Sequence, residues 1–106
     1  MQLMRYQPSH EIAERIFEAV EAETGVTRDL IQSDNRKREL VTARQIAATL
    51  LYTLTGFTLE TVGTMINRDH ASVLYYRNTL LGHIETEDAT VELVWNVVER
   101  LNIEIQ

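Results

Sequence analysis

Residues 67–74 read Asn-Arg-Asp-His-Ala-Ser-Val-Leu, which gathers polar hydrogen-bonding side chains in front of apolar ones. Asp69 is a residue type that caps helix N-termini, so Arg68, His70 and Ser72 fall around a first helical turn. The first turn of a helix carries free backbone N–H groups and the positive end of the helix dipole, and its side chains project outward. Such an end can dock on a phosphate or enter the major groove of DNA.

Two helices joined by a short turn are expected to position this segment. The upstream stretch over residues 57–66 has the pattern of a short amphipathic helix capped by Thr58. The downstream helix, capped by Asp69, should end near Ile84. Its expected buried residues are Val73, Leu74, Leu80 and Leu81. The pair, over residues 58–84, has the proportions of a helix-turn-helix.

Helical spacing of apolar residues predicts the rest of an all-α domain of about six helices. A helix over residues 9–24, capped by Ser9, should direct Ile12, Ile16, Phe17 and Val20 inward. Thr27 should cap a short helix over 28–32. A long helix over about 37–55, followed by Gly56, should form the spine of the domain. Its expected inward residues are Leu40, Ala43, Ile46, Ala47, Leu50, Leu51 and Leu54.

The C-terminal region is expected to form one more helix, over residues 86–102, opened by the polar residues 86–88. Its predicted buried stripe consists of Val91, Val94, Trp95, Val98 and Leu101. The alternation in residues 103–105 could form a strand stub. That stripe could also support dimerisation, and the sequence leaves the oligomeric state open.

The composition is that of one folded domain. A chain of 106 residues with 44% hydrophobic and 25% charged residues can bury a single core, so residues 1–106 are interpreted as one domain. No apolar run approaches the roughly 18 residues that span a bilayer. The first residues lack the apolar stretch and cleavage site of a signal peptide. These features favour a cytoplasmic protein without a membrane partner.

Residue types that carry catalysis or metal binding are sparse. The absence of cysteine excludes disulfides, thiolate zinc sites and cysteine nucleophiles. His10, His70 and His83 lie too far apart for a recognisable ligand spacing. No nucleophile stands beside a base, and no two acids have a catalytic spacing. The sequence therefore predicts neither an enzyme nor a bound metal or cofactor.

The charge is unevenly distributed along the chain. The net charge is −6, but residues 27–77 carry seven basic and five acidic residues, a local balance of +2. Residues 1–26 carry five acids and two bases, and residues 78–106 carry six acids and one base. Acidic flanks of this kind are typical of solvated helix faces. A basic centre is compatible with DNA binding, which depends on neutralising phosphates.

Four motifs follow one another between Gly25 and about Ile84: Arg36-Lys37-Arg38, Ala43-Arg44-Gln45-Ile46-Ala47, Leu54-Thr55-Gly56 and Arg68-Asp69-His70. Together they resemble the C-terminal DNA-binding domain of the bacterial replication initiator DnaA. The resemblance implies a Trp-repressor-like helical bundle with a DnaA-like core over residues 27–84. It also implies binding of double-stranded DNA at AT-rich DnaA-box-like origin sites, in replication initiation or its regulation, and association with the nucleoid.

The resemblance implies that the helix start reads the major groove while an arginine of the basic loop enters the adjacent minor groove. By position that arginine is Arg36, and a narrow minor groove attracts a guanidinium by its negative potential. His70 can donate or accept at a base edge, and Asp69 can accept from a cytosine amino group in addition to its capping. Ser72 can bond a base or a phosphate, and Ala71 offers a methyl group to thymine.

A second set of residues is predicted to contact phosphates. Arg38, Arg44 and Arg68 match family positions near the backbone. The full predicted set is Lys37, Arg38, Arg44, Thr58, Arg68 and Arg77. Arg77 joins the set if the rotation of its helix turns it toward the phosphates. An alternative for Arg44 is pairing with Glu39 or Asp69.

The chain departs from the family at several positions. Ala71 and Ser72 replace two threonines after the histidine, and only Asn67 remains of a glycine-rich turn. Positions that are often basic in the family are occupied here by Thr42, Tyr52, Asn78 and Thr79, which predicts a weaker phosphate grip. The sequence has no phosphate-binding Gly-x-x-x-x-Gly-Lys-Ser/Thr loop. An alternative function is a DnaA-like decoy or regulatory module whose acidic flanks bind another protein.

Overall fold

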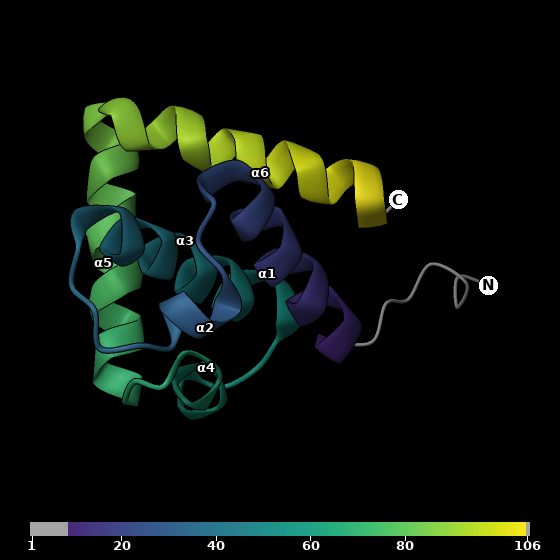
Figure 1. Ribbon diagram of the computed structural model, residues 1–106, viewed down its shortest axis with the longest axis vertical. Helices are drawn as coiled ribbons and strands as arrows, with labels where there is room; N and C mark the ends of the chain where they lie inside the picture. The colour runs from purple at the N-terminus through teal and green to yellow at the C-terminus, as the bar shows by residue number, and fades with distance from the viewer. Residues whose placement is uncertain (1–8, 106) are drawn as a thin grey trace.

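A computed structural model describes residues 9–105, and these residues form six helices and no strand (Figure 1). The helices are α1 (Ser9–Thr24), α2 (Arg28–Ile31), α3 (Arg38–Thr55), α4 (Leu59–Ile66), α5 (His70–Thr86) and α6 (Ala89–Ile105). The predicted all-α fold class is confirmed. No helix in this part of the chain is long and apolar enough to cross a membrane.

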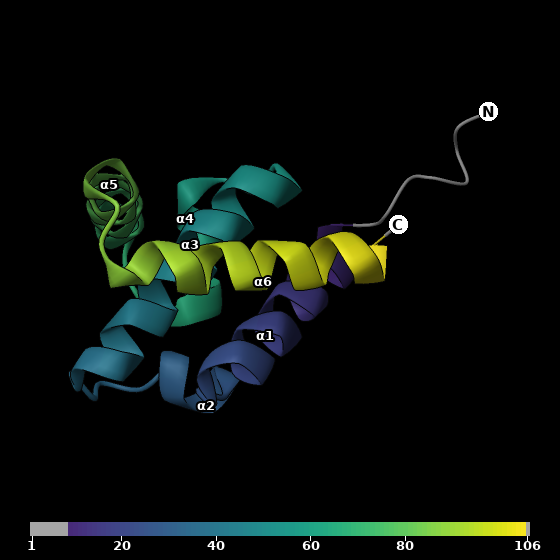
Figure 2. The same cartoon turned by 90° about the horizontal axis from the view of Figure 1, so that it is seen from above.

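Helix α3 is the centre of the domain, as its apolar spacing predicted. It packs against α1, α2, α4 and α5, and ten of its residues are buried. Ile46 and Leu51 have no exposed surface, and they meet Ile16 and Val20 of α1 in one core. Burying each such side chain stabilises the fold by roughly 1.5–3 kcal/mol. Figure 2 shows α6 running from the end of α5 across α1, which it covers on the outside.

The helix starts and ends follow from local chemistry. The side chains of Thr27, Thr58 and Asp69 each accept a hydrogen bond from a backbone N–H of the first helical turn, so all three predicted caps are confirmed. Gly56 ends α3 in the left-handed conformation, at φ +78°, which glycine adopts without a steric penalty. Ser9 is the first described residue of α1, and its hydroxyl donates to the Thr55 carbonyl at 2.8 Å, so its capping role stays a prediction.

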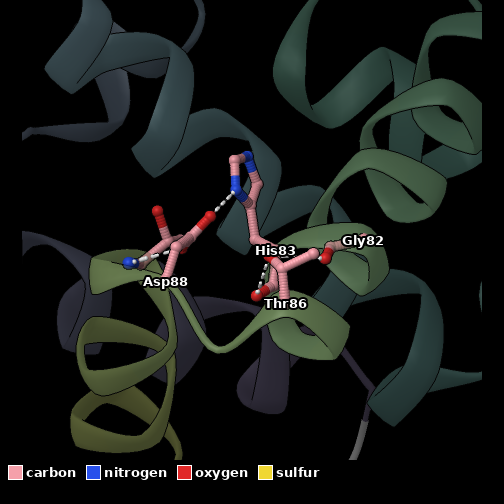
Figure 3. A network of polar contacts seen from close by, with 5 residues as sticks. Gly82, His83, Thr86 and Asp88 are labelled. Atoms are coloured by element: carbon pink, nitrogen blue, oxygen red, sulfur yellow. Dashed lines mark hydrogen bonds and ion pairs between the residues drawn. The ribbon is translucent and has the colours of Figure 1, made fainter.

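The boundary between α5 and α6 differs from the prediction. Helix α5 continues to Thr86, and Glu87 then ends it in the left-handed conformation at φ +55°. Helix α6 begins at Ala89, and Asp88, rather than residue 86, caps its start. One carboxylate oxygen of Asp88 accepts from the Thr90 N–H, and the other pairs with Nδ1 of His83 (Figure 3). Residues 103–105 belong to α6, so the expected strand stub is wrong.

Four residues that the spacing predicted to be buried are exposed by 39–54%: Leu54, Leu74, Leu81 and Trp95. In α6 the covered stripe is formed by Val94, Val97 and Leu101, with Val91 and Val98 only partly buried. For Leu74, Leu81 and Trp95 the physical reason is that α5 and α6 each touch the body along a narrow face, whereas Leu54 lies in the last turn of α3. Only Val73 and Leu80 of α5 are fully covered.

Candidate nucleic-acid interface

The turn between α4 and α5 is held by a close backbone approach. The Arg68 N–H donates to the Gly63 carbonyl at 2.7 Å, and a Cβ placed on Gly63 would lie 2.4 Å from the Arg68 carbonyl oxygen. Asn67 occupies the left-handed region at φ +61°, a conformation that asparagine tolerates better than most side chains. The glycine-poor turn is therefore closed by Asn67 and by the absence of a side chain at Gly63.

The first turn of α5 presents the predicted base-contacting side chains. Asp69, His70 and Ala71 are exposed, and Ser72 is half-buried. One Asp69 oxygen accepts from the Ser72 N–H at 2.8 Å. That hydrogen bond lowers the pKa of Asp69 from its usual value, so the carboxylate is charged at neutral pH. Among residues 9–105 its second oxygen has no hydrogen-bond partner, so it can accept from a ligand.

The basic loop between α2 and α3 projects three cations. Arg36, Lys37 and Arg38 are exposed. The loop backbone is shaped by its own polar side chains, since the Asn35 amide oxygen accepts from the Lys37 N–H at 2.9 Å. Such local hydrogen bonds are typical of turns. The basic loop therefore has a defined shape, with its cations free of protein ion pairs among the described residues.

One surface hollow brings the basic loop and the start of α5 together. Arg36 of the loop lines it with Ser72 of α5 and with the turn residues Asn67 and Arg68. The hollow is completed by Asp34, Val41, Arg44 and Tyr76. Arg36, the candidate minor-groove side chain, therefore shares one face of the molecule with Ser72, a candidate major-groove side chain.

Arg44 does not lie on that face as a free cation. Its side chain is 1% exposed, and its guanidinium donates to four backbone carbonyls, those of Leu30, Ile31, Ser33 and Asn35, at 2.7–3.2 Å. Burial, and then the like charge of Arg68, lower the pKa of Arg44 from its usual value, although an arginine remains protonated. The predicted phosphate contact and the alternative pairing with Glu39 or Asp69 are both contradicted. Arg44 instead stabilises the backbone of residues 30–35 through these hydrogen bonds.

Arg68 is half-buried and divides its donors between two segments. One terminal nitrogen donates to the Asn67 carbonyl at 2.9 Å and to the Ile66 carbonyl at 3.4 Å, and the other donates to the Ser33 carbonyl at 2.8 Å. Arg68 thus joins the turn before α5 to the basic loop.

Thr58 and Arg77 line a second hollow, at the start of α4. Thr58 is exposed. Arg77 donates to the Asn78 side chain at 3.3 Å, and its buried Nε has no hydrogen-bond partner in the part of the chain that the structure describes. The hollow also contains Tyr52, Thr53, Gly56, Phe57, Leu59 and Glu60. The rotation of α5 therefore directs Arg77 toward the N-terminus of α4, where backbone N–H groups favour anions.

Comparison with known proteins identifies the family. A family profile described as "Bacterial dnaA protein helix-turn-helix" matches residues 13–79. The chain belongs to this DnaA helix-turn-helix family. It is similar to the chromosomal replication initiator protein DnaA of Deinococcus radiodurans, with 37% identity over 60 residues, 57% of this chain and 13% of that protein.

Two further DnaA proteins have the same pattern of coverage. The protein of Bacteroides thetaiotaomicron is 43% identical over 58 residues, 54% of this chain and 12% of the relative. The protein of Chlorobaculum tepidum is 26% identical over 102 residues, 95% of this chain and 21% of the relative. The chain thus spans only about a fifth or less of the length of these relatives. The predicted resemblance to DnaA is confirmed.

The sequence did not indicate that Gln32 connects α2 to the end of α4. This residue follows α2, and its side-chain amide donates to the Met65 carbonyl at the end of α4 at 2.7 Å. A lone glutamine after a four-residue helix carries no sequence signal, because its partner is a carbonyl 33 residues away. Clusters of three or more side chains suited to a metal ion are absent from the described residues.

Proposed function

We propose that this chain binds double-stranded DNA sequence-specifically, at AT-rich sites like the DnaA box, in replication initiation or its regulation. The observation that carries the proposal is the shared hollow, in which Arg36 of the basic loop and Ser72 of the α5 start lie on one face. Its family membership supports the same function, because its relatives are named chromosomal replication initiators. A helix start and a neighbouring cationic loop are suited to adjacent grooves of one duplex.

Each exposed residue of the α5 start has a distinct part in the proposed readout. His70 bonds a base edge in the major groove, and the free oxygen of Asp69 accepts from a cytosine amino group. The methyl group of Ala71 contacts thymine, and Ser72 bonds a base or phosphate. Arg36 enters the minor groove, where AT-rich sequence narrows the groove and strengthens its negative potential.

Phosphate contacts fall to the cations outside the core. Lys37 and Arg38 lie on the exposed basic loop and the start of α3, and Thr58 and Arg77 flank the N-terminus of α4. Arg68 keeps part of its surface exposed and contributes charge between these two positions. Such contacts fix the register of the protein on the duplex and carry no sequence information themselves.

Substitution of the two proposed base readers tests the function. We expect His70→Ala and Arg36→Ala each to weaken binding to a DnaA-box duplex by about 1–3 kcal/mol and to reduce the preference for it. The measurement is a titration of labelled box and scrambled duplexes at low salt. Arg15→Ala, which removes an exposed arginine of α1, is the control and should leave the preference unchanged. A box preference that survives both substitutions would contradict the site assignment.

A second candidate function is a decoy or regulatory module that binds a protein. It is favoured by the corner between α5 and α6, where Leu81 and Trp95 are 49% and 54% exposed and Ile84 lines the hollows beside both. The acidic residues of this corner are Glu85, Glu87, Asp88 and Glu92. Their charge suits a partner segment with basic and apolar side chains and repels a second copy or DNA. The same titration decides, since absence of any box preference favours this candidate.

A further inference from the structure

The basic loop is tied to the helix-turn-helix by hydrogen bonds from four side chains, those of Gln32, Arg44, Asn67 and Arg68. The chain of contacts starts at Gln32, whose amide donates to the Met65 carbonyl at 2.7 Å. A second hydrogen bond runs in the opposite direction: the side-chain amide of Asn67 donates to the backbone carbonyl of Gln32 at 3.1 Å. These two hydrogen bonds cross the same gap, so the end of α2 and the turn before α5 cannot separate without breaking both.

Two arginines continue this connection into the basic loop. Arg44 and Arg68 both donate to the Ser33 carbonyl, at 3.2 and 2.8 Å. Arg44 reaches further, to the Asn35 carbonyl next to Arg36. Burying a guanidinium is costly unless its donors are satisfied, and here backbone carbonyls satisfy them. The arginines therefore stabilise one conformation of a loop that has few apolar side chains to hold it.

We propose that Gln32, Arg44, Asn67 and Arg68 form a clamp that fixes the minor-groove arginine relative to the major-groove helix start. The proposal rests on the proposed function and deepens it: these four are positioning residues for Arg36, and Arg68 does this in addition to the phosphate charge proposed for it above. A rigid link between the two readers lowers the entropy lost on binding, because the loop is ordered before it meets DNA. It also sets the spacing between the two groove contacts.

The two smaller members of the clamp permit a test that keeps the core intact. Gln32→Ala removes one crossing hydrogen bond. Asn67→Gly removes the other and preserves the left-handed backbone at φ +61°, which alanine would strain. The matched control is Thr64→Ala combined with Asn96→Ala, because Thr64 bonds only within α4 and both side chains are exposed.

The first measurement needs no DNA. We expect backbone amide hydrogen exchange over residues 33–37 to rise about tenfold in the Gln32→Ala, Asn67→Gly variant, with the amides of α1 unchanged, because local opening becomes easier. The control variant should exchange like the wild type. Equal exchange over residues 33–37 in the wild type and the loosened variant would overturn the clamp, whether or not the protein binds a DnaA box.

The second measurement asks whether the clamp acts through Arg36. Loosening the clamp should weaken box binding about tenfold in the wild-type background and less than about twofold in an Arg36→Ala background. A variant that merely destabilised the fold would lose equally in both backgrounds, and that result would overturn the positioning role. A wild type without box preference would overturn the proposed function and this role together, while the exchange experiment still decides the clamp.

Discussion

Gly63 is the residue at which the helix-turn-helix leaves no room for a side chain. A Cβ there would meet the Arg68 carbonyl oxygen at 2.4 Å, and this neighbour is backbone that cannot rotate away. We expect Gly63→Ala to destabilise the domain by about 1–3 kcal/mol, the usual cost of overpacking, because the turn must shift. Urea denaturation followed by circular dichroism measures the change.

Gly82 is the matched control for Gly63. It lies inside α5, and a Cβ there would meet nothing within 4 Å. Gly82→Ala should therefore stabilise the domain by about 0.5–1 kcal/mol, since alanine is the better helix former. Similar losses of stability in both variants would show that the crowding at Gly63 is not the cause.

At the scale of single residues, the sequence predicts roles that depend on immediate neighbours. Thr27, Thr58 and Asp69 cap their helices because a cap needs only a side-chain oxygen and the next three residues. Arg44 was assigned wrongly because its role depends on carbonyls 9–14 residues away, which fold around it. The sequence shows that an arginine with five N–H donors is present, but it does not show whether those donors are exposed to solvent or buried.

At the scale of elements, Asp88 joins the end of α5 to the start of α6. It caps α6 through the Thr90 N–H and pairs with His83 of α5, as Figure 3 shows. We expect Asp88→Ala to lower the urea midpoint more than Asp88→Asn, because asparagine keeps the cap and loses only the charge. Circular dichroism at neutral pH measures both midpoints, and equal midpoints in the two variants would exclude a contribution from the cap, because both variants lack the charge.

The same residue makes the stability of the domain depend on pH. The hydrogen bond with His83 and that from the Thr90 N–H lower the pKa of Asp88 in the folded protein. A carboxyl with a lowered folded pKa stabilises the fold above its unfolded pKa, about 3.9, and this stabilisation is lost as pH falls through the folded pKa. Asp88→Asn should therefore weaken the acid dependence of stability below about pH 4. A parallel acid curve for the variant would contradict this assignment.

The α5–α6 region also explains which parts of the fold the sequence left undetermined. Apolar spacing predicts α6 and the burial of Val94, but it omits Val97, which is covered, and includes Trp95, which is exposed. A stripe in a sequence is wider than the face that a neighbouring helix covers, so spacing alone cannot choose its centre. The boundary between α5 and α6 lies later in the chain than predicted because Glu87 adopts the left-handed conformation. Glutamate rarely adopts this conformation, so its presence in the sequence does not predict a helix end.

At the scale of the whole molecule, the charges are sorted between the two ends of α5. Its first turn lies beside α4, and its last turn meets α6 at the opposite end (Figure 1). The exposed cations Arg36, Lys37 and Arg38 belong to the end that carries His70, whereas the acidic corner is at the other end. A net charge of −6 is therefore compatible with a DNA face, because the field close to a duplex depends on local charge.

This sorting predicts a measurable dependence of DNA affinity on salt. With about four or five cations available to phosphates, the slope of log affinity against log salt should be about −3 to −5. Lys37→Gln and Arg38→Gln should each bring the slope about one unit closer to zero, because each removes one released counterion. Arg15→Gln removes an exposed charge from α1, outside the hollows of the candidate interface, and should leave the slope unchanged. Titrations of the box duplex over a series of salt concentrations give the slopes. Equal shifts for all three variants would mean that net charge, rather than the basic loop, governs binding.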